Sequence, residues 1–156
     1  MKNRGETDVT FVKIPWRATL LALTALLPAA CADFGLSGNP IVGTWNTPDR
    51  QQIAFRDDGV LITLPGQQPT PMTAQTCEGD FRFSYKSRTR EMLLGLTSRQ
   101  PDLNRKLTAM LVRPEYPVAE VNCGEGYSAY VLVDEQHVVV IHRDRDVGGL
   151  EQLTRI

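Results

Sequence analysis

Hydrophobic and polar residues alternate along several short stretches of the chain, which is the pattern of half-buried β-strands. The clearest stretch is 80–86, with one aromatic face and one polar face: Phe81, Phe83 and Tyr85 against Arg82, Ser84 and Lys86. The stretch 91–97 alternates in the same way and is predicted to be another strand, with Met92, Leu94 and Leu96 facing inward.

Turn residues separate further strand-like stretches into hairpins. Asp58-Gly59 lies between two β-prone runs around 53–55 and 60–64, which is a strong hairpin signal. A second hairpin is predicted from 127–133 and 137–142, whose Val-Val-Val-Ile run is apolar on both faces. Residues 144–149 are predicted to be a polar turn before a closing strand at 150–156, and the proline-rich stretch 65–71 to be a loop.

The period changes from two to about 3.6 between residues 101 and 113. Leu103, Leu107, Met110 and Leu111 then share one helical face, Pro101 suits a first helical position, and Pro114 follows the end. We therefore predict one short helix here, and a strand over Lys-Leu-Thr-Ala-Met-Leu-Val is the alternative.

A basic N-terminal region precedes the uncharged apolar run 18–30. This run is shorter than the roughly 20 residues of a membrane-spanning helix and has the length of a signal-peptide core. Residues 1–30 are therefore predicted to be a signal peptide. Retention as an uncleaved anchor is the alternative to a cleaved signal. If the signal is cleaved, ordinary signal peptidase acting after small residues is the alternative to cleavage with lipidation.

The sequence Leu-Pro-Ala-Ala-Cys at 27–31 resembles the lipobox of bacterial lipoproteins. The resemblance implies lipidation at Cys31, a flexible tether over 31–40, and a periplasm-facing lipoprotein of a bacterial cell envelope. Ala32 after the lipidated cysteine implies sorting to the outer membrane rather than retention at the inner one.

Cys77 and Cys123 are the two cysteines that remain. An even pair in an oxidising compartment usually forms a disulfide, so a Cys77–Cys123 bridge is predicted, with two buried free thiols as the alternative. Neither cysteine belongs to a C-x-x-C motif, which disfavours a redox-active or zinc site.

Length and charge indicate one domain, residues 41–156, that does not bind nucleic acid. The formal net charge of the whole chain is −1, which is unlike the basic surface of a nucleic-acid-binding protein. A chain of this length can bury a single hydrophobic core.

Gly43-Thr44-Trp45 resembles the G-x-W that opens the first strand of lipocalin-like barrels, including small bacterial lipoproteins of that type. The resemblance implies a lipocalin-like antiparallel β-barrel. Together with the helix and the disulfide predicted above, we therefore expect a mostly β fold, a barrel with one short helix and a single disulfide. The resemblance also implies that Arg155 packs on Trp45 beside Gly43 to close one end of the barrel.

No group of nucleophile, base and oxyanion donors can be assembled from the sequence. His137 and His142 are five residues apart and are expected on opposite faces of one strand, and Glu125 lies in a glycine-rich turn. We therefore expect a non-catalytic protein without a metal or cofactor.

The predicted inner face of the barrel is apolar and aromatic: Phe81, Phe83, Tyr85, Met92 and Leu94. Such a face suits a cavity for a small apolar ligand or lipid. It equally suits a filled barrel that serves as an accessory or structural subunit, or a protease inhibitor, in an envelope protein complex.

Overall fold

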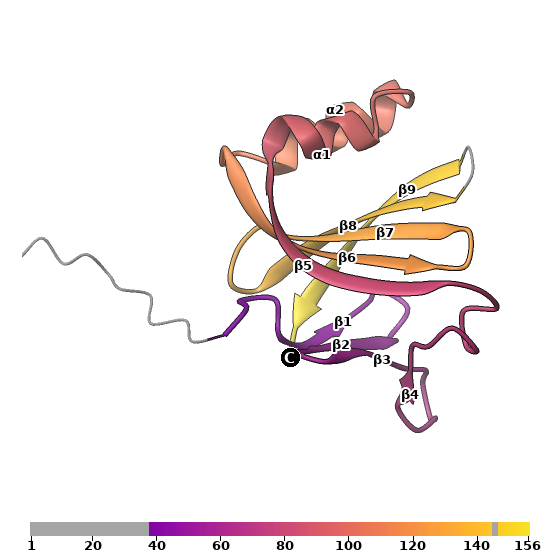
Figure 1. Ribbon diagram of the computed structural model, residues 1–156. Helices are drawn as coiled ribbons and strands as arrows, with labels where there is room; N and C mark the ends of the chain where they lie inside the picture. The colour runs from indigo at the N-terminus through magenta and orange to yellow at the C-terminus, as the bar shows by residue number, and fades with distance from the viewer. Residues whose placement is uncertain (1–37, 145–146) are drawn as a thin grey trace, which may run out of the picture. The chain divides into compact units, whose positions relative to one another are not determined.

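Nine antiparallel strands of the described residues form one sheet in the order β4-β3-β2-β1-β9-β8-β7-β6-β5 (Figure 1). The computed structural model describes residues 38–144 and 147–156. The predicted signal peptide, Cys31 and most of the tether lie outside the described residues. The strands are β1 (Gly43–Asn46), β2 (Gln52–Arg56), β3 (Gly59–Thr63), β4 (Thr70–Pro71), β5 (Phe81–Thr89), β6 (Glu115–Cys123), β7 (Gly126–Leu132), β8 (His137–Asp144) and β9 (Val147–Arg155).

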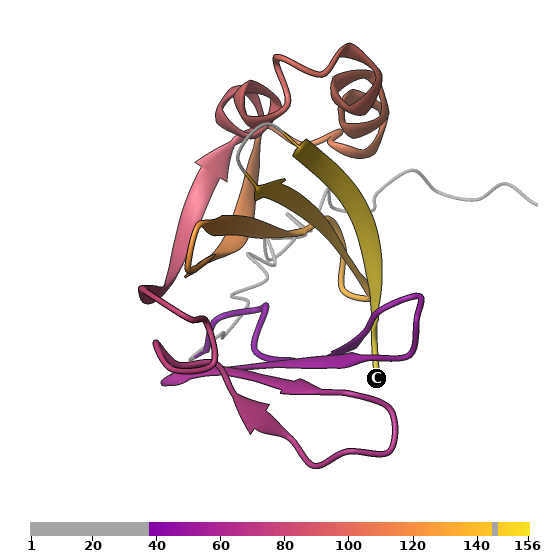
Figure 2. The same ribbon diagram turned by 90° about the vertical axis from the view of Figure 1, so that its right-hand side faces the viewer.

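The sheet curls into a half-barrel. Its first three strands lie across the strands β5 to β9, and β1 joins the two parts by pairing with β2 on one side and with β9 on the other (Figure 2). β5 pairs only with β6 among the described residues, so no ladder closes the barrel between β5 and β3. The predicted mostly antiparallel β fold is confirmed, but the sheet is a half-barrel instead of a closed barrel.

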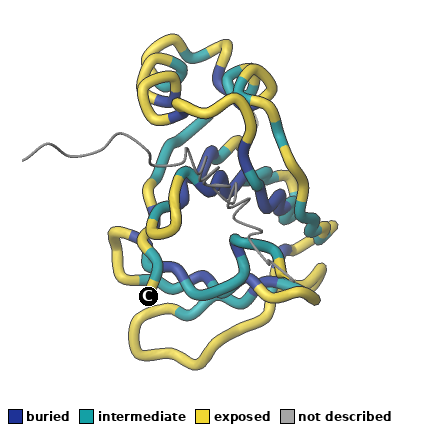
Figure 3. The backbone as a smooth tube through the Cα atoms, turned by 90° about the vertical axis from the view of Figure 1, so that its left-hand side faces the viewer, coloured by how far each residue is buried: buried dark blue, intermediate teal, exposed yellow. Residues whose placement is uncertain are grey.

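The strands β6 to β9 contribute side chains to two hydrophobic cores, one on each face of the sheet. Buried residues run through the middle of the domain, and the exposed residues lie toward its ends (Figure 3). On β8, Val138 and Val140 belong to the core inside the half-barrel, and Val139 and Ile141 belong to a second core on the outer face. This confirms that the Val-Val-Val-Ile run is covered on both sides. Because side chains alternate along a strand, one strand supplies both cores.

Two helices cover the outer face (Figure 1). The helix α2 (Pro101–Met110) is the predicted one, with Pro101 in its first turn and Leu107 fully buried, although it ends three residues earlier than expected. The single-helix prediction missed α1 (Arg90–Leu96).

The predicted strand at 91–97 is wrong, because these residues form α1. Thr89 begins the helix, and its side-chain oxygen accepts a hydrogen bond from the Met92 backbone N–H at 3.3 Å. The Arg90 backbone N–H donates to the Pro114 carbonyl at 2.8 Å, and the Asn104 side-chain amide donates to the Leu94 carbonyl at 2.8 Å. Contacts with the segment after α2 and with α2 itself thus favour a helix over the strand that alternation suggests.

The two predicted hairpins are present. β2 and β3 pair from Gln52↔Thr63 to Arg56↔Gly59, and β7 and β8 pair from Leu132↔Val138 to Gly126↔Asp144. The predicted turn at 144–149 is shorter, because β8 continues to Asp144 and β9 begins at Val147.

Candidate functional site

Trp45 and Arg155 lie at one end of the half-barrel, as cross-strand neighbours on β1 and β9. Trp45 is fully buried, and its indole N–H donates to the Ile41 carbonyl at 2.9 Å. The Arg155 guanidinium lies over the indole, 4.5 Å from the ring centroid, and donates to the Pro40 carbonyl. Gly43, with φ of 141°, lies beside this guanidinium. The three residues expected to close the barrel therefore meet.

Aromatic side chains fill the space between the walls of the half-barrel. Phe55 on β2 packs edge-on against Tyr130 on β7, with ring centroids 4.8 Å apart, and stacks with Phe83 on β5 at 6.3 Å. Phe83 in turn packs against Tyr85 at 4.7 Å. Phe55 is 1% exposed and Tyr130 is 5% exposed. Burial raises the pKa of Tyr130 to about 12, with the charge of Glu151 adding to the effect.

The open side of the half-barrel is an aromatic seam, which we define as Met72, Phe81, Phe83 and Tyr85. These side chains are partly buried against the inner core. The Tyr85 hydroxyl donates to the Arg56 carbonyl at 2.9 Å and so ties β5 to the β2–β3 hairpin. Side-chain contacts replace a strand ladder here, so the outer edge of β5 keeps its backbone groups unpaired with any described strand.

Met92 and Leu94 do not belong to the barrel interior, which corrects their predicted position. Both lie on α1, where Met92 is 57% exposed and Leu94 packs against the outer core. Phe81, Phe83 and Tyr85 do face the inner core as expected.

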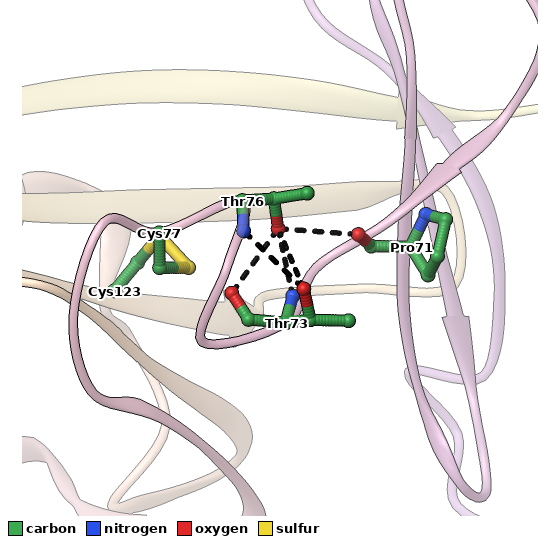
Figure 4. Close-up of a disulfide and its surroundings, with 5 residues drawn as sticks. All are labelled: Pro71, Thr73, Thr76, Cys77 and Cys123. Atoms are coloured by element: carbon green, nitrogen blue, oxygen red, sulfur yellow. Dashed lines mark hydrogen bonds between the residues drawn. A yellow bond between two sulfur atoms is a disulfide. The ribbon is translucent and has the colours of Figure 1, made fainter.

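A disulfide joins Cys77 and Cys123, as predicted (Figure 4). It attaches the loop before β5 to the end of β6. Within that loop the Thr76 hydroxyl accepts from the Thr73 backbone N–H at 2.8 Å and donates to the Pro71 carbonyl at 3.2 Å (Figure 4). These contacts, with the disulfide, link the loop to the end of β4 and to β6.

Gly124 permits the close approach of this loop to the β6–β7 turn. Its φ is 60°, and a Cβ at this position would come within 2.8 Å of the Cys77 carbonyl oxygen. Glycine satisfies both the backbone conformation and the lack of space. The predicted turn beside the disulfide is therefore present, and Glu125 lies in it.

Polar side chains from the neighbouring strands β7, β8 and β9 contact one another in a row. His142 Nδ1 is 2.9 Å from the Ser128 hydroxyl, and its Nε2 is 3.3 Å from a Glu151 carboxylate oxygen. Sequence reasoning missed Ser128 and Glu151, because only the strand register places Ser128 opposite His142. His137 instead contacts Asp134 at 2.8 Å, so the two histidines have separate partners.

Glu120 on β6 is the charged residue most deeply buried on the outer face, with 6% exposure. Its carboxylate accepts from Lys86 at 2.7 Å and from Arg88 at 2.7 Å. Burial alone would raise the pKa of Glu120, but the hydrogen bonds and positive charges of Lys86 and Arg88 outweigh burial and lower the pKa. The cluster stabilises the pairing of β5 with β6.

Within the described residues, no three His, Cys, Asp or Glu side chains are placed to hold a metal ion. Over the same residues, no helix is both long enough and apolar enough to cross a membrane.

Comparison of the chain with known proteins found no match. No family model matches it, and neither a curated protein nor a solved structure is significantly similar to it.

Proposed function

We propose that the chain is a non-catalytic accessory lipoprotein of a bacterial cell envelope, with a lipocalin-like half-barrel that binds a partner protein along the outer edge of β5. The anchor in this proposal is a lipid on Cys31, with the domain on the periplasmic side of the outer membrane. The lipobox-like sequence before Cys31 and the cysteine pair joined at 77 and 123 support an exported protein.

The filled interior is the observation that carries this choice over a lipid carrier. Tyr130 on β7 and Phe83 on β5 both contact the ring of Phe55 on β2, so these rings cross the interior of the half-barrel. A ligand inside would have to displace these side chains, and each buried aromatic ring contributes several kcal/mol, on the order of 3–5, to stability.

The edge of β5 supports binding of an extended partner segment. β5 is nine residues long and presents one unpaired edge, and unpaired strand edges bind other strands through backbone hydrogen bonds. The outer face of β5 carries Arg82, Lys86 and Arg88, which contact Asp80 or Glu120, and its inner face carries the seam residues Phe81, Phe83 and Tyr85. An extended segment whose apolar side chains alternate with polar ones fits this edge best, because Phe81, Phe83 and Tyr85 offer apolar surface on one face.

Site-specific photocrosslinking in intact envelopes tests the partner. A photoreactive residue replaces Arg82 on β5, and a matched variant carries it at Gln152, which is an exposed strand position on β9. We expect one discrete cross-linked protein from position 82 and none from position 152. Equal cross-linking from both positions would contradict a specific β5 interface.

Trp45 emission tests the lipid-carrier alternative. Cleavage before Cys31 removes Trp16, which leaves Trp45 as the only tryptophan of the mature chain. Because the interior is filled, we expect no saturable change in emission or melting temperature when fatty acids are added. A saturable change would favour a ligand inside the barrel over the accessory function.

A further inference from the structure

An open cavity of about 480 Å³ lies where the connection between α1 and α2 meets β8 and β9. Residues 95–100 line it on one side, and His142, Arg143 and Gly148 line it on the other. The cavity is outside the aromatic seam and contains none of the residues in the proposed function.

Arg99 and Arg143 line this cavity, and both are exposed. Among the described residues, neither guanidinium makes a hydrogen bond or ion pair with another side chain. Arg82, Arg88 and Arg105 each contact a carboxylate. An exposed cationic pair without a carboxylate is available to bind an anion from solution.

Among the described residues, the carboxylates of Glu151 and Asp144 near this end of the half-barrel have other surroundings. Glu151 contacts His142, and Asp144 lines a different cavity beside the disulfide together with Glu78, Asp80 and Glu125. Negative charge is thus concentrated in the second cavity, and the unpaired positive charge of Arg99 and Arg143 lies in the first.

The connection between α1 and α2 packs on β9 beside Gly148. A Cβ at this position would come within 2.4 Å of the Gln100 side-chain amide, so that amide lies directly against Gly148. Arg99 precedes Gln100 in that connection, and Arg143 pairs with Gly148 across the ladder. The exposed Ser98 in the same connection supplies a hydroxyl donor to the cavity.

We infer that this cavity binds a phosphate group through Arg99 and Arg143. Each guanidinium donates parallel hydrogen bonds in a fork that matches two oxygens of an oxyanion, and two such groups suit a doubly charged anion. The phosphate belongs either to free inorganic phosphate or to the headgroup of a phospholipid at the membrane surface.

Amide chemical shifts of residues 95–100 and Gly148 in the full chain test the site. Inorganic phosphate or glycerol phosphate is added at constant ionic strength, with chloride as the reference anion. Saturation by both ligands supports recognition of phosphate itself, and saturation by glycerol phosphate alone supports a headgroup. Shifts no larger than those from chloride would overturn the inference.

The double variant R99Q/R143Q identifies the residues responsible. Hydrogen bonds between charged groups are stronger than those between neutral groups. We therefore expect this variant to bind phosphate at least about tenfold more weakly. Arg50→Gln is the matched control, since Arg50 is also exposed and has no partner among the described side chains, and we expect it to stay within about twofold of the parent. Equal weakening in both variants would refute a localised site.

Discussion

Replacement of Arg155 tests whether the Trp45–Arg155 contact holds the two parts of the sheet together. β1 pairs with β9 at only two positions, Trp45↔Arg155 and Asn46↔Thr154. The Arg155 side chain adds a contact over the indole and a hydrogen bond to the Pro40 carbonyl. Arg155→Ala removes both, and Arg155→Lys keeps the charge but removes the planar group.

The expected loss in the free energy of unfolding follows from three contributions. A buried cation–π contact contributes about 2 kcal/mol, and a hydrogen bond from a charged donor contributes about 1.5–3 kcal/mol. Against these, Arg155 Nε is buried without a partner among the described residues, and removing it relieves a cost of about 1–3 kcal/mol. We expect the free energy of unfolding to fall by about 2 kcal/mol for Arg155→Ala and by about 1 kcal/mol for Arg155→Lys.

Urea denaturation followed by Trp45 emission in the mature chain measures both values. With an m-value typical of a small domain, the midpoint for Arg155→Ala should decrease by about 1–2 M. Arg105→Ala is the control, because Arg105 and its partner Asp102 are almost fully exposed and their 3.5 Å pair contributes little. A change below about 0.5 kcal/mol in Arg155→Ala would refute the structural role of the contact.

Further variants test the other parts of the fold. Replacing both Cys77 and Cys123 by Ala should lower the free energy of unfolding by up to about 4 kcal/mol, from the loop entropy of a 46-residue separation, and a melting curve unchanged by the substitution would contradict this. Leu107→Ala should cost about 3 kcal/mol in chemical denaturation because Leu107 is fully buried. The 57%-exposed Met92 should tolerate Ser within about 0.5 kcal/mol, and a loss as large as that for Leu107 would place Met92 in a core after all. The pKa of Glu120 is lowered in the folded state, so its contribution is present above the unfolded pKa and is lost as pH falls through the folded pKa. Glu120→Gln should therefore flatten the acid limb of a stability-against-pH curve, and an identical limb in both proteins would refute this linkage.

Local patterns predicted the elements whose signals are contained within a few residues. Alternation of aromatic and polar residues identified β5, Asp58-Gly59 identified the β2–β3 turn, and helical periodicity after Pro101 identified α2. The strand β6 was missed because Pro117 interrupts it. Thr89 and Glu91 carried a helix-start signal for α1, but the alternation of residues 91–97 obscured that signal.

The sequence by itself determined the strand-rich class, both hairpins and the pair of cysteines that bond, because turn chemistry, period and cysteine number are local or compositional properties. Tertiary structure decided between helix and strand at α1, because two local signals disagreed there and the helix ends are held by Pro114 and Asn104. It also decided that β5 stays unpaired on one edge and that Arg99 lies on the same cavity as Arg143. These features depend on which segments meet after the sheet curls, and strand register across long sequence separations is not written in any short pattern.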